Sequence, residues 1–158
     1  MDDFLPELRS AVADQTDSAV AIRRALHRRP ELAFTEHETT AAIAAAPSEV
    51  GLDPIVRDAS IGLHVDVGDA GPMVAFRADI DGLPITEASG VPFSSEIPGV
   101  MHACGHDAHT AIAVGLARAL HHMELPGRVR FIFQPAEETV PSGAPDLVAE
   151  GVLTGVES

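Results

Sequence analysis

The sequence lacks four residue types and nearly lacks a fifth. Lysine, asparagine, tryptophan and tyrosine are absent from the 158 residues, and cysteine occurs once, as Cys104. A single cysteine excludes an internal disulfide, so Cys104 is expected to be a metal ligand or a reactive thiol. All ten basic residues are arginine, and the net charge is −14. Non-specific binding to nucleic acid is disfavoured, because contacts with phosphates need a basic surface.

Long apolar runs are also missing. No run approaches the length needed to cross a membrane, and the N-terminal segment MDDFLPELRS is acidic, unlike a secretory signal. We therefore expect a cytoplasmic protein with no membrane partner. An acidic surface without lysine keeps proteins soluble in strong brine, so we expect a salt-adapted, halophilic source. The alternative is an ordinary acidic protein.

The residues that are present predict one α/β domain with a sizeable core, since 46% of them are hydrophobic. Periodicity and breakers predict helix 12–28, helix 35–46, strands 61–67 and 73–78, helix 107–123, strand 128–134 and a short helix 146–151. Thr35 and Glu38 have the spacing of a capping box. The turn sequence GDAGP predicts that the first two strands form a pair joined by a tight turn. A long Pro-, Gly- and Ser-rich loop covers 80–100.

A β-α-β unit sets the expected position of the polar residues. Strand 73–79, helix 107–123 and strand 128–134 should form a right-handed crossover with parallel strands. In open α/β sheets, sites form at the carboxyl edge of such strands. Asp79, Cys104, His106, Glu137 and Glu138 all fall at this edge in the sequence, so we expect them to be neighbours.

The segment MHACGHDAHT, residues 101–110, has three interpretations. Thiolate and imidazole are good ligands for zinc and similar divalent ions, and Gly105 lets the flanking side chains of Cys104 and His106 face one centre. A nucleophilic thiol and a solvated histidine-rich loop are the alternatives. Within the segment, His102 and His109 are ambiguous, and packing is the simpler explanation for each.

Acidic residues at the same edge suit metal-assisted hydrolysis. Of Glu137 and Glu138, one could hold a metal while the other takes a proton from a water that the metal activates. A surface acid pair is the alternative. Asp79 could hydrogen-bond the free nitrogen of a ligand histidine, or could cap a loop, and Asp81 has the same two possibilities with weaker support.

Four segments resemble the metal-dependent amidohydrolase family that includes hippurate hydrolase, N-acyl-amino-acid amidohydrolases and auxin-conjugate hydrolases. They are LHRRPELAFTEHET at 26–39, FRADIDGLPITE at 76–87, GVMHACGHDAHT at 99–110 and FIFQPAEE at 131–138. The resemblance implies a zinc-peptidase-like (phosphorylase/hydrolase-like) α/β catalytic domain with a mixed sheet. It also implies a small N-acyl amino acid as substrate.

The resemblance implies a role for each matched residue. Cys104, His106 and Glu138 correspond to metal ligands, with Cys104 bridging two ions. Glu137 corresponds to the general base, and Asp79 to the aspartate that orients the histidine ligand. Two divalent ions per complete site are implied, commonly zinc, manganese, nickel or cobalt.

Length is the main departure from this family. Residues 1–158 correspond to the N-terminal portion of the catalytic domain, without the lid or dimerisation domain and without two further histidine ligands. We therefore expect an incomplete site. One interpretation is an enzyme fragment that a second polypeptide completes, and the other is a non-catalytic remnant or partner subunit. After FQPAEE the family usually continues with a Gly-rich stretch, whereas this sequence has TVPSGAPDL, so the loop after Glu138 is expected to differ.

Overall fold

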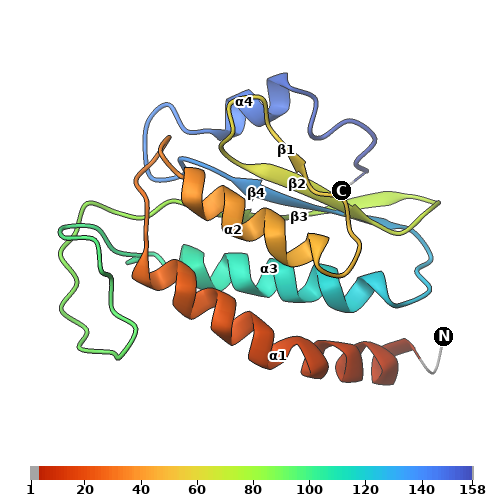
Figure 1. Cartoon of the computed structure of the whole chain (residues 1–158). Coiled ribbons are helices and arrows are strands. Elements are labelled where there is room, and N and C mark those ends of the chain that lie inside the picture. The colour runs from red at the N-terminus through yellow and green to blue at the C-terminus, as the bar shows by residue number, and fades with distance from the viewer. Residues whose placement is uncertain (1–3, 158) are drawn as a thin grey trace.

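A mixed sheet with helices on both faces forms the structure, a computed structural model that describes residues 4–157 (Figure 1). The helices are α1 (Phe4–Arg28), α2 (His37–Ser48), α3 (His106–His121) and α4 (Ala144–Ala149). The strands are β1 (Ile55–Val56), β2 (Leu63–Val67), β3 (Met73–Asp79) and β4 (Arg128–Gln134). The α/β class and the mixed sheet are confirmed. In the described part of the chain, no helix has both the length and the apolar character that a bilayer span requires.

The strands lie in the order β1-β2-β4-β3. β3 and β4 are parallel, with Phe76 opposite Phe131, which confirms the predicted β-α-β unit. The expected pairing of the runs 61–67 and 73–78 is wrong, because β4 lies between β2 and β3 and pairs antiparallel with β2.

The reason lies in β4 and in the turn that precedes β3. Phe131, Ile132 and Phe133 are buried on both faces of the sheet, so this strand gains most from a central position. The turn between β2 and β3 wraps around the start of β4 instead of closing a hairpin. A Cβ at Gly68 would lie 2.5 Å from the carbonyl oxygen of Gly127, a separation that only glycine allows.

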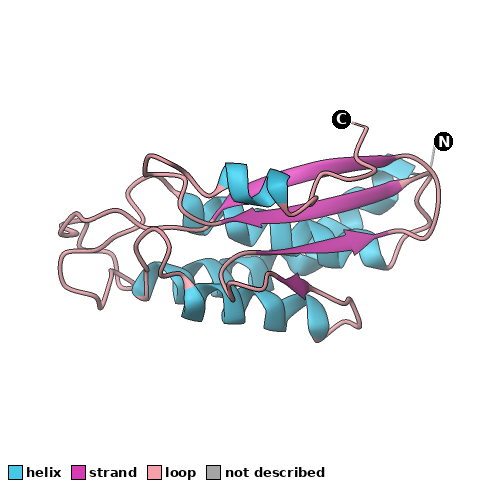
Figure 2. Cartoon of the chain, turned by 90° about the horizontal axis from the view of Figure 1, so that it is seen from above, coloured by secondary structure: helices cyan, strands magenta, loops and turns pink. Residues whose placement is uncertain are grey.

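The helices form two unequal layers. α2 and α3 cover one face of the sheet, α1 packs along the outer side of α3, and the short α4 lies on the opposite face (Figures 1 and 2). The main core joins Phe131 and Phe133 to Val114 of α3. Gly115 lets α1 approach closely, since its Cβ would lie 3.3 Å from that of Ala19. A smaller cluster beneath α4 contains Ile132, Leu147 and Val152.

The predicted capping box of the second helix is wrong. The hydroxyl of Thr35 donates to the carbonyl of Leu32, and α2 begins two residues later, at His37. The carboxylate of Glu31 caps this helix instead, accepting the N–H groups of Glu38 (3.1 Å) and Thr39 (2.7 Å). The sequence pattern did not predict this cap, because Glu31 reaches the helix only when the chain folds back before residue 37.

Candidate metal centre

Cys104, His106 and Glu138 converge at the carboxyl edge of the parallel strands. One potential ligand atom from each residue lies within 4.8 Å of the other two. The Nε2 atom of His106 lies 3.9 Å from Oε1 of Glu138 and 4.0 Å from Oε2 of Glu137. Ligands bound to one tetrahedral ion at about 2.0–2.3 Å lie roughly 3–4 Å apart, and the separation of 3.9 Å between His106 and Glu138 falls in this range.

Local backbone geometry produces this convergence. Gly105 has a φ of 84° and forms the N-cap of α3, so the chain turns sharply between Cys104 and His106. His106 starts the helix and is buried, whereas Cys104 is exposed. On the other side, Ala136 has a φ of 55°, which turns the chain immediately before Glu137.

Asp81 contacts both segments that carry the candidate ligands, the one with His106 and the one with Glu138. Its Oδ1 lies 3.2 Å from Nδ1 of His106, which also contacts the Asp81 carbonyl oxygen at 2.9 Å. Its Oδ2 accepts the backbone N–H of Glu138 at 2.9 Å. Because Nδ1 of His106 donates to Asp81, Nε2 faces the two glutamates and offers a lone pair to a metal ion once its proton is lost.

Asp79 does not have the position expected for the orienting aspartate. Its carboxylate accepts from the Arg77 guanidinium at 3.0 Å, and its carbonyl oxygen accepts from the Thr110 hydroxyl. Burial raises the pKa of Asp79, and the guanidinium of Arg77 opposes that rise. The contact on His106 belongs to Asp81, which follows the strand end by two residues. The backbone N–H of Gly82, bonded to the Glu31 carbonyl, fixes the bend there.

Glu36 is a further residue at the site that the sequence did not indicate. Its carboxylate is fully buried and accepts the N–H of Ala136 at 2.7 Å. Burial raises the pKa of Glu36 to about 7, although the N–H donors to its carboxylate oppose the rise. Since Ala136 precedes Glu137, this contact holds the turn that aims both glutamates.

Electrostatics at the centre favour a cation over a nucleophilic thiol. The hydrogen bond to Glu138, burial and nearby carboxylates raise the pKa of Cys104 above its ordinary value. A reactive cysteine needs the opposite shift. Burial lowers the pKa of His106, but its contacts with Asp81 outweigh burial and raise it to about 8. Excess negative charge therefore surrounds a donor set of one sulfur, one nitrogen and one oxygen.

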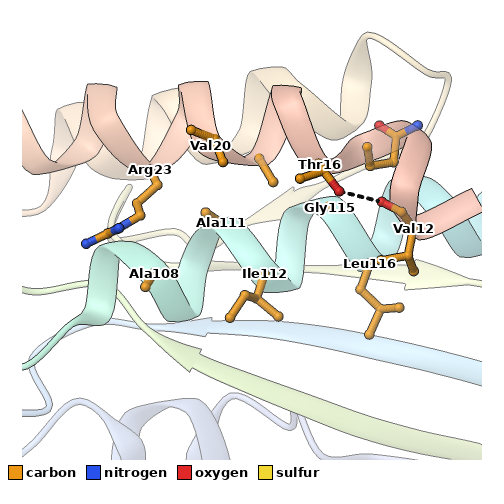
Figure 3. Close-up of a pocket in the computed structure, with 11 residues that line it drawn as sticks. Val12, Thr16, Val20, Arg23, Ala108, Ala111, Ile112, Gly115 and Leu116 are labelled. Carbon is orange, nitrogen blue, oxygen red and sulfur yellow. Dashed lines mark hydrogen bonds between the residues drawn. The ribbon is translucent and has the colours of Figure 1, made fainter. Parts of the chain in front are cut away.

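An apolar groove lies away from the metal centre. It is a surface groove of about 400 Å³ between α1 and α3 (Figure 3), with apolar walls that include Val12, Val20 and Ile112. Arg23 lies at one end and turns toward the start of α3. The other lining residues carry no titratable group, so this groove lacks the chemistry of the metal centre.

Comparison with known proteins finds relatives that match most of this chain. A Rhodococcus jostii protein whose name places it among glutamate–cysteine ligases is 50% identical over 135 residues, which cover 85% of this chain and 17% of that protein. An N-acetylcysteine deacetylase from Bacillus subtilis is 45% identical and matches 88% of this chain and 38% of its own length. A solved dinuclear metal-binding peptidase of the M20 family, also from B. subtilis, superimposes with a TM-score of 0.80 at 44% identity.

The solved peptidase covers 89% of this chain, and the match takes in 40% of that peptidase. The chain thus spans well under half the length of these relatives. Residues 75–157, more than half of the chain, match the profile of one family and contain the whole Cys104, His106 and Glu138 cluster. This chain belongs to the peptidase family M20/M25/M40.

Proposed function

We propose that residues 1–158 form the N-terminal part of a metal-dependent amidohydrolase that cleaves N-acyl amino acids. The convergence of Cys104, His106 and Glu138 from two separate loops, with Asp81 joining the loops, carries this proposal. The deacetylase relative acts on an N-acyl amino acid, and the structural relative binds two metal ions. Hippurate, an N-acyl glycine, is the first substrate to test.

The donor set suits a divalent ion of intermediate softness. Thiolate and imidazole favour zinc, cobalt or nickel, while manganese prefers oxygen ligands. A divalent ion held by these residues would polarise the substrate carbonyl and make a neighbouring water more acidic. We therefore rank zinc, cobalt and nickel above manganese for this site.

In this proposal, Glu137 moves the proton. Its side chain is 38% exposed, and its Oε2 lies 4.0 Å from His106, so a water could reach both. In the proposed reaction, Glu137 takes a proton from the water whose oxygen bonds to the amide carbon. The C–N bond then breaks as Glu137 returns the proton to the amine, which gives a carboxylic acid and an amino acid. Asp79 contributes its negative charge, which helps raise the pKa of His106.

A site with two ions requires more ligands than this cluster supplies. A tetrahedral ion needs about four ligands, so Cys104, His106 and Glu138 with one water suffice for one ion but not for two. We propose that a second polypeptide segment supplies the remaining ligands and closes the site. In the alternative function, the chain binds metal through these residues without catalysing a reaction and serves as a partner subunit.

The test is metal titration combined with hydrolysis. The protein is loaded with Zn²⁺ or Co²⁺, metal content is measured, and release of free amine from hippurate and N-acetylcysteine is followed. Cys104→Ala should lose both metal and turnover, whereas Glu137→Gln should keep metal and lose turnover. His121→Ala, on an exposed helix end, is the control and should change neither.

The possible outcomes distinguish an active amidohydrolase from an incomplete site, and they also test whether the metal centre exists. Turnover that depends on metal and on Glu137 supports the amidohydrolase. One ion bound through Cys104 without turnover supports the incomplete site that a second segment must complete. Failure to bind Zn²⁺ or Co²⁺ would overturn the metal centre itself.

A further inference from the structure

A buried charge cluster lies beside the metal centre and joins three parts of the chain. His27, near the end of α1, is 7% exposed and has a carboxylate on each ring nitrogen. Its Nδ1 lies 2.8 Å from Oδ2 of Asp107, and its Nε2 lies 3.1 Å from Oε1 of Glu87. Arg23 donates to the same oxygen of Asp107 at 3.0 Å.

The geometry points to an imidazolium at His27. A carboxylate only accepts, so each ring nitrogen must donate a proton, and an imidazole with two N–H groups is positively charged. The charge balance agrees, because Arg23 and His27 then offset Asp107 and Glu87, whereas a neutral His27 would leave an excess buried negative charge. Serine donors, chiefly the Ser89 hydroxyl, lower the pKa of Glu87 to about 2, so this carboxyl is ionised.

The two hydrogen-bond partners of His27 belong to the segments that carry the candidate ligands. Asp107 directly follows His106 in the first turn of α3. Glu87 belongs to the long loop that ends at Cys104, and it also accepts the backbone N–H of Ser95. Phe93 of the same loop packs edge-on against the His27 ring at 5.4 Å, and the Arg24 guanidinium lies over Phe93.

We infer that His27, as an imidazolium, is a positioning residue that ties α1 to both segments carrying Cys104 and His106. Its link to metal binding rests on the proposed function, but its charge state does not. Burial lowers the pKa of His27, and the contacts with Glu87 and Asp107 outweigh burial and raise it. The stabilisation that charged His27 provides is therefore complete below the ordinary histidine pKa and is lost as the pH rises through the raised pKa of His27. His102, at 6.3 Å between ring centroids, is a further titratable neighbour.

The first experiment measures the charge state directly. Long-range ¹⁵N–¹H spectra of the metal-free protein, with His27 assigned through bonds from its backbone, distinguish two ring N–H groups from one. At pH 7.5 His27 should show both. Amide exchange across residues 86–98, corrected for its intrinsic pH dependence, should quicken once His27 titrates. A neutral His27 at pH 7.5 would overturn the inference.

The second experiment measures positioning. Co²⁺ bound to a thiolate gives a charge-transfer absorption, and its titration gives a dissociation constant. His27→Gln should weaken Co²⁺ binding about tenfold, as is usual for residues that support ligands, and His121→Gln should leave it unchanged. If His27→Gln does not fold, Glu87→Gln tests the loop arm with a milder change. Unchanged affinity in the folded variants would refute positioning. Wild-type protein that binds no Co²⁺ would overturn the metal centre while leaving the spectroscopic result intact.

Discussion

Replacing Asp81 with asparagine should weaken metal binding by about one to two orders of magnitude. The carboxylate of Asp81 lies 3.2 Å from Nδ1 of His106, whose hydrogen bond goes to the Asp81 carbonyl oxygen, and it accepts the N–H of Glu138. Asparagine removes the negative charge beside His106, and its NH₂ group would face either the His106 ring N–H or the Glu138 N–H. A lost hydrogen bond to a charged group costs about 1.5–3 kcal/mol, and 1.4 kcal/mol is a factor of ten in affinity. The expected loss is therefore about 10- to 100-fold.

Competition with a chromophoric chelator gives the Zn²⁺ or Co²⁺ dissociation constant of each variant. Asp79→Asn is the matched comparison, because Asp79 bonds Arg77 instead of His106. The sequence indicated Asp79 as the orienting residue, and the structure indicates Asp81. A larger loss in Asp79→Asn than in Asp81→Asn, with both proteins folded, would refute the structural reasoning.

Three further predictions concern stability. With EDTA present, the free energy of unfolding should fall by about 3 kcal/mol between pH 4.5 and 7, because the raised pKa of Glu36, about 7, makes the folded state hold a proton that the unfolded state loses. Urea unfolding of the wild type and of Glu36→Gln across this pH range measures the effect, and parallel pH curves for the two proteins would contradict it. Gly68→Ala should lower stability by about 1 kcal/mol or more beyond Gly99→Ala, since both have positive φ but only Gly68 meets a backbone oxygen; equal melting temperatures would count against this. The net charge of −14 should make the melting temperature rise steeply in molar KCl, and a flat response would eliminate salt adaptation.

The sequence was sufficient for the β-α-β unit and the position of the site. Apolar strands that end in polar residues, joined by an amphipathic helix, bring distant segments to one sheet edge by topology alone. The convergence of Cys104, His106 and Glu138 follows from that rule and needs no knowledge of side-chain contacts.

Other features depend on tertiary contacts that no local pattern encodes. The central position of β4 results from its burial on both faces, which competes with the shorter connection between β2 and β3. Glu31 caps α2 from outside the helix, and Glu36 reaches a residue a hundred positions away. No local pattern indicates a partner for His27, because both of its partners are more than fifty residues distant.

The position of β4 also sets the order in which this chain can assemble. During synthesis β2 and β3 emerge first, yet in the finished sheet they do not touch, because each pairs with β4. Neither can complete its backbone pairing until residues 128–134 have left the ribosome. A nascent chain that ends before Arg128 therefore leaves β3 unpaired and one edge of β2 open, although β1 can already pair with the other edge of β2, and these open edges make the chain a substrate for chaperones and a risk for aggregation.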